Sequence, residues 1–347
     1  MLFKTATLSQ LGEFDEIIDV RSPAEFADDH IPGAINFPVL NDEERARVGT
    51  LYTQNSPFEA RKVGAVLVAR NIAAHIENRL SAYPKSWRPL IYCWRGGQRS
   101  GAMSIILNQV GWAAHKLEGG YKQYRRDVIR QLEVLPGGFK FEVLCGPTGS
   151  GKSRFLKALE ETEHQVLDLE TLAQHRGSVL GNLPHAPQPS QKGFESRLLH
   201  QLVQLDPARP VYIEAESRKI GRLAVPDSLL QAMHTAGNCR RLETAVPVRV
   251  SALLEDYPHF TENRELLETQ LDLLQPFHPR STLEGWRESI ARGDFSTLVE
   301  SLLITHYDPA YFRAMGKNYA DLVNAETVSL SDLTPATLKE RAALLPH

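Results

Sequence analysis

The chain has 347 residues, a formal net charge of −3 and 42% hydrophobic residues, which is enough chain for two ordinary domains. This charge excludes a protein that coats nucleic acid by charge alone, although basic runs at 121–126 and 218–222 leave local RNA binding open. No apolar run of about 18 residues predicts a membrane span, and no secretory signal opens the sequence. Three cysteines are too few for a disulfide framework and favour a reducing, cytoplasmic location.

The first part of the chain alternates short apolar runs with helical patterns. Residues 16–20 and 89–92 are typical of buried strands, and 30–36 predict a turn into a second short strand. Ser22, Pro23 and Glu25 predict a helix start, with Ser22 as the N-cap. Residues 59–80 have helical spacing, and a further helix follows Ser100 and can end at Gly111. Residues 116–120 predict a strand and a turn.

The second part begins after Leu135-Pro136-Gly137-Gly138, which is the best linker signal in the chain. We therefore predict two domains, 1–134 and 135–347. Residues 141–145, 166–169, 211–213 and 245–246 predict strands with helices between them, and 250–320 predict a helical, charged region. Strands that alternate with helices favour a parallel sheet. The expected fold class is therefore α/β in both domains, the second with helical additions.

The segment after the 89–92 strand predicts an anion-binding cysteine loop. Cys93 is followed by five residues and then by Arg99, where a helix opens. Backbone N–H groups in such a loop point inward, and the helix N-terminus adds partial positive charge, so a thiolate and a bound oxyanion are both stabilised. The predicted oxyanion ligands are Arg95, Gly96, Gly97 and Arg99. A buried structural cysteine is the alternative, and tyrosine phosphatases and arsenate reductases share the Cys-x5-Arg spacing, but Tyr92 stands where phosphatases have His.

Residues 146–153 match the phosphate-binding pattern G-x4-G-K-[ST] in full, between a predicted strand and a predicted helix. The predicted diphosphate ligands are Gly146, Thr148, Gly149, Ser150, Gly151, Lys152 and Ser153, with the Ser153 hydroxyl available to Mg²⁺. Possible metal or acid–base groups are Glu216, Glu214 and Asp168. The pattern indicates a polyphosphate rather than ATP in particular, and no Asn-Lys-x-Asp motif for a guanine base is present.

The segment that follows the P-loop is long, polar and poor in apolar periodicity, and it predicts a functional or disordered loop. Its candidate RNA- or substrate-binding residues are His175, Arg176, Ser178, Gln188, Ser190, Gln191 and Lys192, with Arg218 further on. Cys145 and Cys239 are interpreted as structural.

Four segments of the first part resemble a rhodanese domain over about 1–131. They are Ile18–Phe26, His30–Asn36, the Cys93 loop and Leu117–Tyr121. The resemblance implies a persulfide or perselenide carried on Cys93. Asp19, Arg21, Glu25 and His30 match the family pattern, and we expect them to make turn contacts that stabilise the fold. Trp94 and Tyr121 are candidates for stacking on an RNA base, with core packing as the alternative.

The rhodanese-like half is joined to a P-loop half that carries the runs 175–178, 188–192 and 305–309. With this combination, nearly the whole chain resembles bacterial tRNA 2-selenouridine synthases. The resemblance implies a transferase that acts on wobble 2-thiouridine in the tRNAs for Lys, Glu and Gln. The sulfur is first geranylated from geranyl diphosphate, and selenophosphate then replaces the S-geranyl group. Implied partners are the tRNA anticodon stem-loop and an enzyme that supplies selenophosphate. One departure is Ala215, where the family pattern leads us to expect an acidic residue.

The residues leave several readings open. Cys93 can carry selenium as a covalent adduct, or selenophosphate can attack the base directly. A rhodanese-type sulfurtransferase or phosphatase with an ATP-hydrolysing P-loop domain is the alternative function. A non-catalytic RNA binder that senses phosphate is the third.

Overall fold

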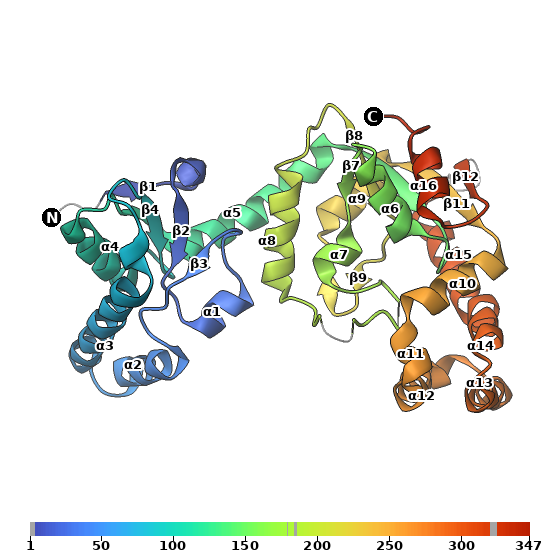
Figure 1. The fold of residues 1–347 in the computed structure, drawn as a ribbon, viewed down its shortest axis with the longest axis horizontal. Helices are drawn as coiled ribbons and strands as arrows, with labels where there is room; N and C mark the ends of the chain where they lie inside the picture. The colour runs from blue at the N-terminus through green and yellow to red at the C-terminus, as the bar shows by residue number, and fades with distance from the viewer. Residues whose placement is uncertain (1–3, 179, 184–185, 320–324) are drawn as a thin grey trace. The chain divides into compact units, whose positions relative to one another are not determined.

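The computed structural model describes residues 4–178, 180–183, 186–319 and 325–347. The chain forms two compact units: the first comprises residues 1–131 and 190–200, and the second comprises residues 132–189 and 201–347 (Figure 1). Both units contain a five-stranded parallel sheet with helices, which confirms the predicted α/β class. Within the described residues, no helix combines the length and the apolar character needed to cross a membrane.

The sheet of the first unit has the order β1-β5-β4-β2-β3. Its strands are β1 (Thr5–Ala6), β2 (Glu16–Asp19), β3 (Ile35–Asn36), β4 (Pro89–Tyr92) and β5 (His115–Leu117). Its helices are α1 (Pro23–Asp28), α2 (Asp42–Gln54), α3 (Pro57–Asn78), α4 (Gln98–Val110) and α5 (Gly120–Val134). Apolar side chains of α3 and α4, including Ile72 and Met103, form one buried cluster with Ile18 and Ile91 of the central strands. This packing fixes the end of β4, from which Cys93 emerges.

Most elements of the first unit follow the sequence prediction. Ser22 and Glu25 form the predicted capping box at the start of α1, with Glu25 Oε2 accepting from the Ser22 N–H at 3.1 Å. Gly111 ends α4 with a φ of +112°, a conformation that favours glycine.

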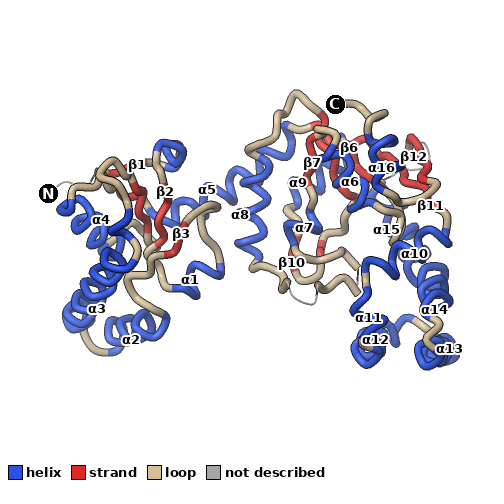
Figure 2. Tube along the Cα trace, viewed as in Figure 1, coloured by secondary structure: helices blue, strands red, loops and turns tan. Residues whose placement is uncertain are grey.

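Figure 2 draws the strands of the second unit in red. Their sheet has the order β12-β11-β6-β8-β7. Its strands are β6 (Lys140–Cys145), β7 (Gln165–Leu167), β8 (Pro210–Glu214), β11 (Asn238–Thr244) and β12 (Glu326–Leu330), and a separate hairpin joins β9 (Lys219–Ile220) and β10 (Leu223–Ala224). Helices α6 (Lys152–Glu161) and α16 (Pro335–Ala342) pack on the sheet through Phe155 and Leu338. The remaining helices near the sheet are α7 (Leu169–Ala173) and α9 (Asp227–Ala236).

A helical group follows β11, as the sequence predicts for 250–320. It comprises α10 (Val246–Asp256), α11 (Pro258–Glu262), α12 (Arg264–Leu271), α13 (Arg280–Arg292), α14 (Phe295–Leu302) and α15 (Asp308–Asn318). Helices α11 to α14 enclose an apolar cluster centred on Leu274, Trp286 and Ile290. This cluster is separate from the one under the sheet.

Two expectations about the second unit are wrong. The strand predicted at 245–246 does not form, because Ala245 is the N-cap of α10 and the strand is β11, just before it. Charged residues such as Arg240, Arg241 and Glu243 interrupt the apolar pattern of β11, so a search for apolar runs does not find this strand. The segment after the P-loop is not one long loop, since α7 and α8 (Gln191–Leu202) lie within it.

Helix α8 packs largely on the first unit although it follows the P-loop in sequence. Ser196 Oγ donates to Asp29 Oδ2 at 3.0 Å, and Lys192 Nζ lies 2.6 Å from Asp28 Oδ2. Arg125 and Glu195 form a further ion pair. Burial raises the pKa of Asp29, although hydrogen bonds from Tyr121 and Ser196 oppose this. A segment that follows the P-loop in sequence therefore belongs to the first unit.

Candidate active sites

The Cys93 loop lies between β4 and α4, where the sequence predicts it. The Cys93 side chain is buried, and its Sγ accepts a hydrogen bond from the Gly97 N–H at 3.2 Å. Ser100 Oγ lies at the same distance from this sulfur, within hydrogen-bonding range. Donors aimed at a sulfur at a helix N-terminus stabilise negative charge on it. The loop therefore has the geometry that a nucleophilic or sulfur-carrying cysteine requires.

Two glycines with positive φ allow the loop to close. Gly96 has a φ of +63°, and a Cβ at this position would lie 2.9 Å from the Leu117 carbonyl oxygen. Gly120 has a φ of +60°, and a Cβ there would lie 2.3 Å from the carbonyl oxygen of Cys93. In return, the N–H of Tyr121 donates to that carbonyl at 2.9 Å. The start of α5 is thereby fixed against the loop, which only glycine permits.

The two arginines of the loop differ in their surroundings. Arg99 forms an ion pair with Glu25, with Nη1 2.6 Å from Oε2, and both side chains are mostly buried. Burial raises the pKa of Glu25, but the hydrogen bond and charge of Arg99 outweigh it and leave the pKa below its ordinary value. Arg95 is exposed. Of the two predicted oxyanion ligands, Arg95 is therefore the one turned to solvent, and Arg99 would have to leave Glu25 to bind.

The other rhodanese-pattern residues make the expected structural contacts. Arg21 and Asp19 form a fully buried ion pair at 2.6 Å, and Arg21 also lies over the Tyr121 ring, 3.9 Å from its centroid. His30 Nδ1 is hydrogen-bonded to the Phe26 carbonyl at 2.8 Å. Tyr121 is buried, so it belongs to the core rather than to an RNA-stacking surface. Trp94 is 39% exposed beside Cys93 and keeps a ring face available.

In the second unit, the P-loop joins β6 to α6. Gly149 and Gly151 have φ values of +77° and +91°, and a Cβ on Gly151 would lie 2.5 Å from Leu333 Cδ2. Lys152 Nζ donates to the Gly146 carbonyl at 2.8 Å, so the side chain crosses the loop. Ser150 Oγ is buried without a hydrogen-bond partner. Polyphosphate oxygens are the acceptors that such a loop is shaped to receive.

An arginine that the sequence did not single out holds the outer part of the P-loop. Arg249 of α10 is buried and donates to the Thr148 carbonyl from Nε at 2.9 Å and from Nη2 at 2.7 Å. The same guanidinium forms a bidentate pair with Asp308, at 2.9 and 2.6 Å. Asp308 lies in the 305–309 run that carries part of the family resemblance, but nothing in the sequence links it to Arg249.

Three glutamates gather beside the P-loop. Glu170 Oε2 accepts from Ser153 Oγ at 2.8 Å, and Glu214 Oε1 accepts from the Glu170 N–H at 2.8 Å. Burial, followed by the charge of Glu170, raises the pKa of Glu216 to about 8, while the charge of Lys152 opposes this. Burial and the neighbouring acids also raise the pKa of Glu214 far above its ordinary value. Among the described residues, no three His, Cys, Asp or Glu side chains are placed to hold a metal ion by themselves.

The predicted residues divide into those at the P-loop and those elsewhere. A cavity of about 2200 Å³, including open solvent, is lined by Thr148 to Ser153, Glu170, His175 to Ser178 and Glu216. His175 is buried, which lowers its pKa, and its Nδ1 accepts from the Gly177 N–H at 3.1 Å. The guanidinium of Arg176 lies 4.8 Å from the centroid of the Tyr257 ring. Glu170 and Tyr257 are members of this site that the sequence reasoning missed.

The remaining predicted residues have structural contacts. Asp168 caps α7 by accepting from the Thr171 N–H at 2.7 Å. Gln188 Nε2 donates to the Ile220 carbonyl at 2.9 Å and so supports the β9–β10 hairpin. Arg218 pairs with Asp227 on the surface. Ser190, Gln191 and Lys192 lie at the start of α8, where Gln191 Nε2 donates to Glu195 Oε1 at 2.8 Å.

The other two cysteines lie in neighbouring strands of the second sheet. A hydrogen bond with the Cys239 thiol, together with burial, raises the pKa of Cys145, which is consistent with the inert role that the sequence predicts.

Comparison with known proteins gives two domain matches and several long relatives. The family model described as the AAA domain of tRNA 2-selenouridine synthase matches residues 139–280, and the rhodanese-like domain model matches residues 5–127. Relatives described as tRNA 2-selenouridine synthase include proteins of Bdellovibrio bacteriovorus, 31% identical over 88% of this chain and 90% of that protein, and Alcanivorax borkumensis, 34% identical over 85% and 88%. The Nitrosomonas europaea protein is 38% identical over 70% of this chain, and the match spans 63% of its own length.

Proposed function

The chain belongs to the tRNA 2-selenouridine synthase family, and we propose that it replaces the sulfur of wobble 2-thiouridine by selenium in the tRNAs for Lys, Glu and Gln. The observation that carries the proposal is the presence, in one chain, of a rhodanese-type cysteine loop and a complete P-loop. Two sites that each bind a phosphorylated small molecule suit a reaction with two phosphorylated donors. We therefore assign geranyl diphosphate to the P-loop and selenophosphate to the Cys93 loop.

The first step activates the sulfur. The thiocarbonyl sulfur forms a bond to carbon 1 of geranyl diphosphate, the carbon–oxygen bond breaks, and pyrophosphate leaves while the base loses its N3 proton. Lys152 and the loop N–H groups stabilise the negative charge that develops on the leaving diphosphate. The step converts a poor leaving group into a thiol, which the second step can expel.

Magnesium fits the P-loop as a helper, because the donor atoms there are hard oxygens. Mg²⁺ binds through one or two carboxylates together with substrate phosphates, and Ser153, Glu170 and Glu216 supply a hydroxyl and two carboxylates at the loop. Burial and the charge of Glu170 raise the pKa of Glu216, and a bound dication would favour the ionised form of both carboxylates. When bound, Mg²⁺ would neutralise charge on the departing diphosphate.

The second step replaces the S-geranyl group. Selenium of selenophosphate attacks carbon 2 of the base, geranyl thiolate leaves, and hydrolysis of the selenium–phosphorus bond releases phosphate. This route needs no electrons from another source. In transfer through a selenium–sulfur adduct, the Cys93 thiolate attacks selenium, the selenium–phosphorus bond breaks and phosphite leaves, and a thiol reductant must then free the selenium. Mass spectrometry of the protein after selenophosphate treatment, with and without a thiol, distinguishes the two routes.

Variants of the two loops test the assignment. Lys152→Ala is expected to abolish geranylation of a thiolated anticodon stem-loop and to leave selenation of pre-geranylated RNA largely intact. Cys93→Ser is expected to show the opposite pattern if selenium is carried on the cysteine, and to retain both steps if selenophosphate attacks the base directly. Equal loss of both steps in either variant contradicts the division of labour. Hydrolysis of ATP that depends on Lys152 and needs no RNA favours the sulfurtransferase with an ATPase domain instead.

A further inference from the structure

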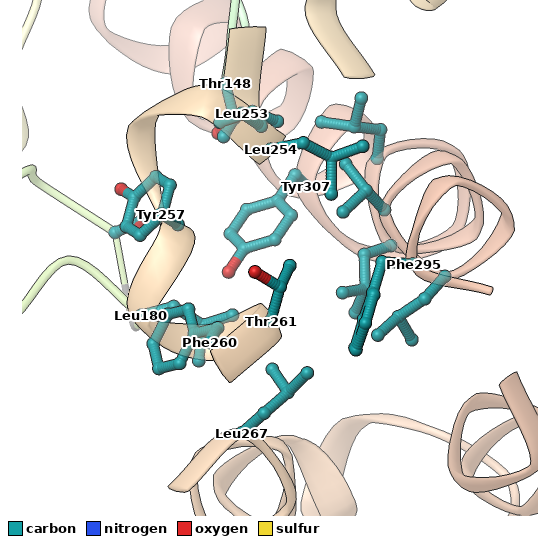
Figure 3. Close-up of a pocket in the computed structure, with 15 residues that line it drawn as sticks. Thr148, Leu180, Leu253, Leu254, Tyr257, Phe260, Thr261, Leu267, Phe295 and Tyr307 are labelled. Carbon is teal, nitrogen blue, oxygen red and sulfur yellow. The ribbon is translucent and has the colours of Figure 1, made fainter. Parts of the chain in front are cut away.

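An apolar cavity in the second unit lies beside the P-loop and has no role so far. It is formed where α10, α11, α12 and α14 meet, and its volume is about 600 Å³ including the space at its mouth (Figure 3). Its apolar lining residues are Leu180, Leu253, Leu254, Phe260, Leu267, Phe295, Leu298, Val299, Leu302 and Leu303. The other five lining residues are Thr148, Ser178, Tyr257, Thr261 and Tyr307, so no described residue with a charged side chain lines the cavity.

The apolar cavity shares part of its wall with the cavity over the P-loop. Thr148, Ser178, Leu253, Tyr257 and Tyr307 line both the apolar cavity and the larger cavity over the P-loop. Figure 3 shows the Tyr307 ring projecting among the lining side chains, with its hydroxyl toward Thr261. The Ser178 side chain lies near the hydroxyl ends of both tyrosines. The rings of Tyr257 and Tyr307 add apolar surface to this wall.

A ligand that fills both spaces must have a phosphorylated end and an uncharged hydrocarbon chain. We propose that this cavity binds the isoprenoid tail of the prenyl diphosphate whose diphosphate lies in the P-loop. The inference rests on the proposed geranyl transfer, and it adds the residues that recognise the donor. A nucleotide matches this lining less well, because its ribose and base would bury polar groups against leucine and phenylalanine side chains.

The aromatic residues suit an allylic donor in particular. Carbon 1 of the donor lies next to its diphosphate, so it must lie near the wall that both cavities share. Tyr257 and Tyr307 supply rings at this wall. Positive charge develops on the allylic carbon as the carbon–oxygen bond breaks, and aromatic faces attract such charge. An acidic side chain at this wall would also attract the charge, but it would repel the diphosphate.

Binding measurements on the full chain test the cavity without requiring turnover. Isothermal titration calorimetry in Mg²⁺ buffer compares geranyl diphosphate with inorganic pyrophosphate. Burial of the tail is expected to make geranyl diphosphate bind about 100-fold tighter or more. Val299→Phe places a larger side chain at the cavity wall and is expected to weaken geranyl diphosphate about tenfold while pyrophosphate affinity is unchanged. Ile304→Phe, at a position that is 54% exposed, is the matched control.

A second variant acts in the opposite direction. Leu254→Ala enlarges the cavity and is expected to shift the preference from geranyl toward farnesyl diphosphate. Unchanged pyrophosphate affinity in each variant shows that the P-loop is folded. Equal binding of pyrophosphate and geranyl diphosphate by the wild-type chain overturns the inference, as does a Val299→Phe variant that behaves like Ile304→Phe.

The outcomes separate this inference from the proposed function. If the wild-type chain geranylates RNA but neither cavity variant changes donor affinity or chain-length preference, the function stands and the cavity assignment fails. If the chain transfers no geranyl group but binds geranyl diphosphate through this cavity, the tail site stands and the reaction must be another use of a prenyl diphosphate.

Discussion

The clamp formed by Arg249, Thr148 and Asp308 gives a quantitative prediction for the second unit. The Arg249 side chain is 4% exposed and that of Asp308 is 19% exposed. Arg249→Leu removes the guanidinium and leaves a mostly buried carboxylate and the Thr148 carbonyl without this donor. Removal of one partner of a buried pair costs about 3–5 kcal/mol. Water can reach part of Asp308, so we expect the lower end, about 3 kcal/mol of unfolding free energy.

The matched control is the pair between Arg287 and Asp272 in the same unit. Its two side chains are 48% and 52% exposed, and the N–O distance is 2.8 Å. Exposed pairs contribute about 0–1 kcal/mol, so Arg287→Leu is expected to change stability little. Urea unfolding followed by circular dichroism measures both variants, with the transition of the second unit analysed separately.

A double variant separates the pair from general damage. Arg249→Leu combined with Asp308→Leu removes both charges, and it is expected to cost about 1–3 kcal/mol less than the sum of the two single changes. Because the clamp holds a P-loop carbonyl, Arg249→Leu is also expected to weaken pyrophosphate binding about tenfold. A stability loss within about 1 kcal/mol of that in Arg287→Leu would refute the reasoning, as would strict additivity in the double variant.

Three further predictions concern single side chains. The pKa of Glu216 is raised to about 8, so the folded chain holds a proton that the unfolded chain releases above about pH 4.5. In EDTA, the contribution of Glu216 to the free energy of unfolding therefore falls as pH rises between these values, by up to about 1.36 kcal/mol per pH unit. Urea midpoints measured across this pH range should change less for Glu216→Gln than for the wild-type chain. Gly120→Ala is expected to destabilise the first unit by about 2 kcal/mol or more and to reduce selenation, whereas Gly12→Ala, where a Cβ meets nothing within 4 Å, should be neutral in both calorimetry and activity. Trp94→Ala is expected to weaken RNA binding by about 1–3 kcal/mol with little change in the reaction of the cysteine with selenophosphate, and Tyr52→Ala, another exposed aromatic of the same unit, should leave titrations with a fluorescent anticodon stem-loop unchanged.

The features that could be predicted from the sequence are those written in contiguous residues. The loop between Cys93 and Ser100 and the P-loop each need a strand, closely spaced glycines and a helix start, and all of these lie within about ten residues of each other. The structure places both loops as expected. The capping box of α1 is of the same kind.

The features that could not be predicted depend on contacts between distant parts of the chain. The ion pair of Arg99 is one example, because its partner Glu25 lies 74 positions earlier. Arg249 and Asp308 are 59 positions apart and lie in different helices. The same holds for the apolar cavity, because its wall combines residues from Thr148 to Tyr307 that look like ordinary core positions in sequence. Periodicity shows that a helix face is apolar. It does not show whether other side chains pack against that face or leave a cavity beside it.

The charges around the P-loop explain why the glutamates matter to the choice of ligand. Arg154 is paired with Glu255 and Asp256, and Asp256 also pairs with Arg176. Lys152 and Lys157 also line the cavity over the P-loop, and the charge of Lys152 acts on Glu170 and Glu216. A diphosphate brings several negative charges to this place, and two lysines do not balance them together with two ionised glutamates. Either the glutamates bind as neutral acids or a divalent cation enters with the diphosphate. If the glutamates are neutral, donor affinity falls above about pH 8, where Glu216 ionises. If a cation enters, donor affinity depends on that cation. The pH profile of donor binding, measured in EDTA and in Mg²⁺, therefore identifies the charge state in which the P-loop works.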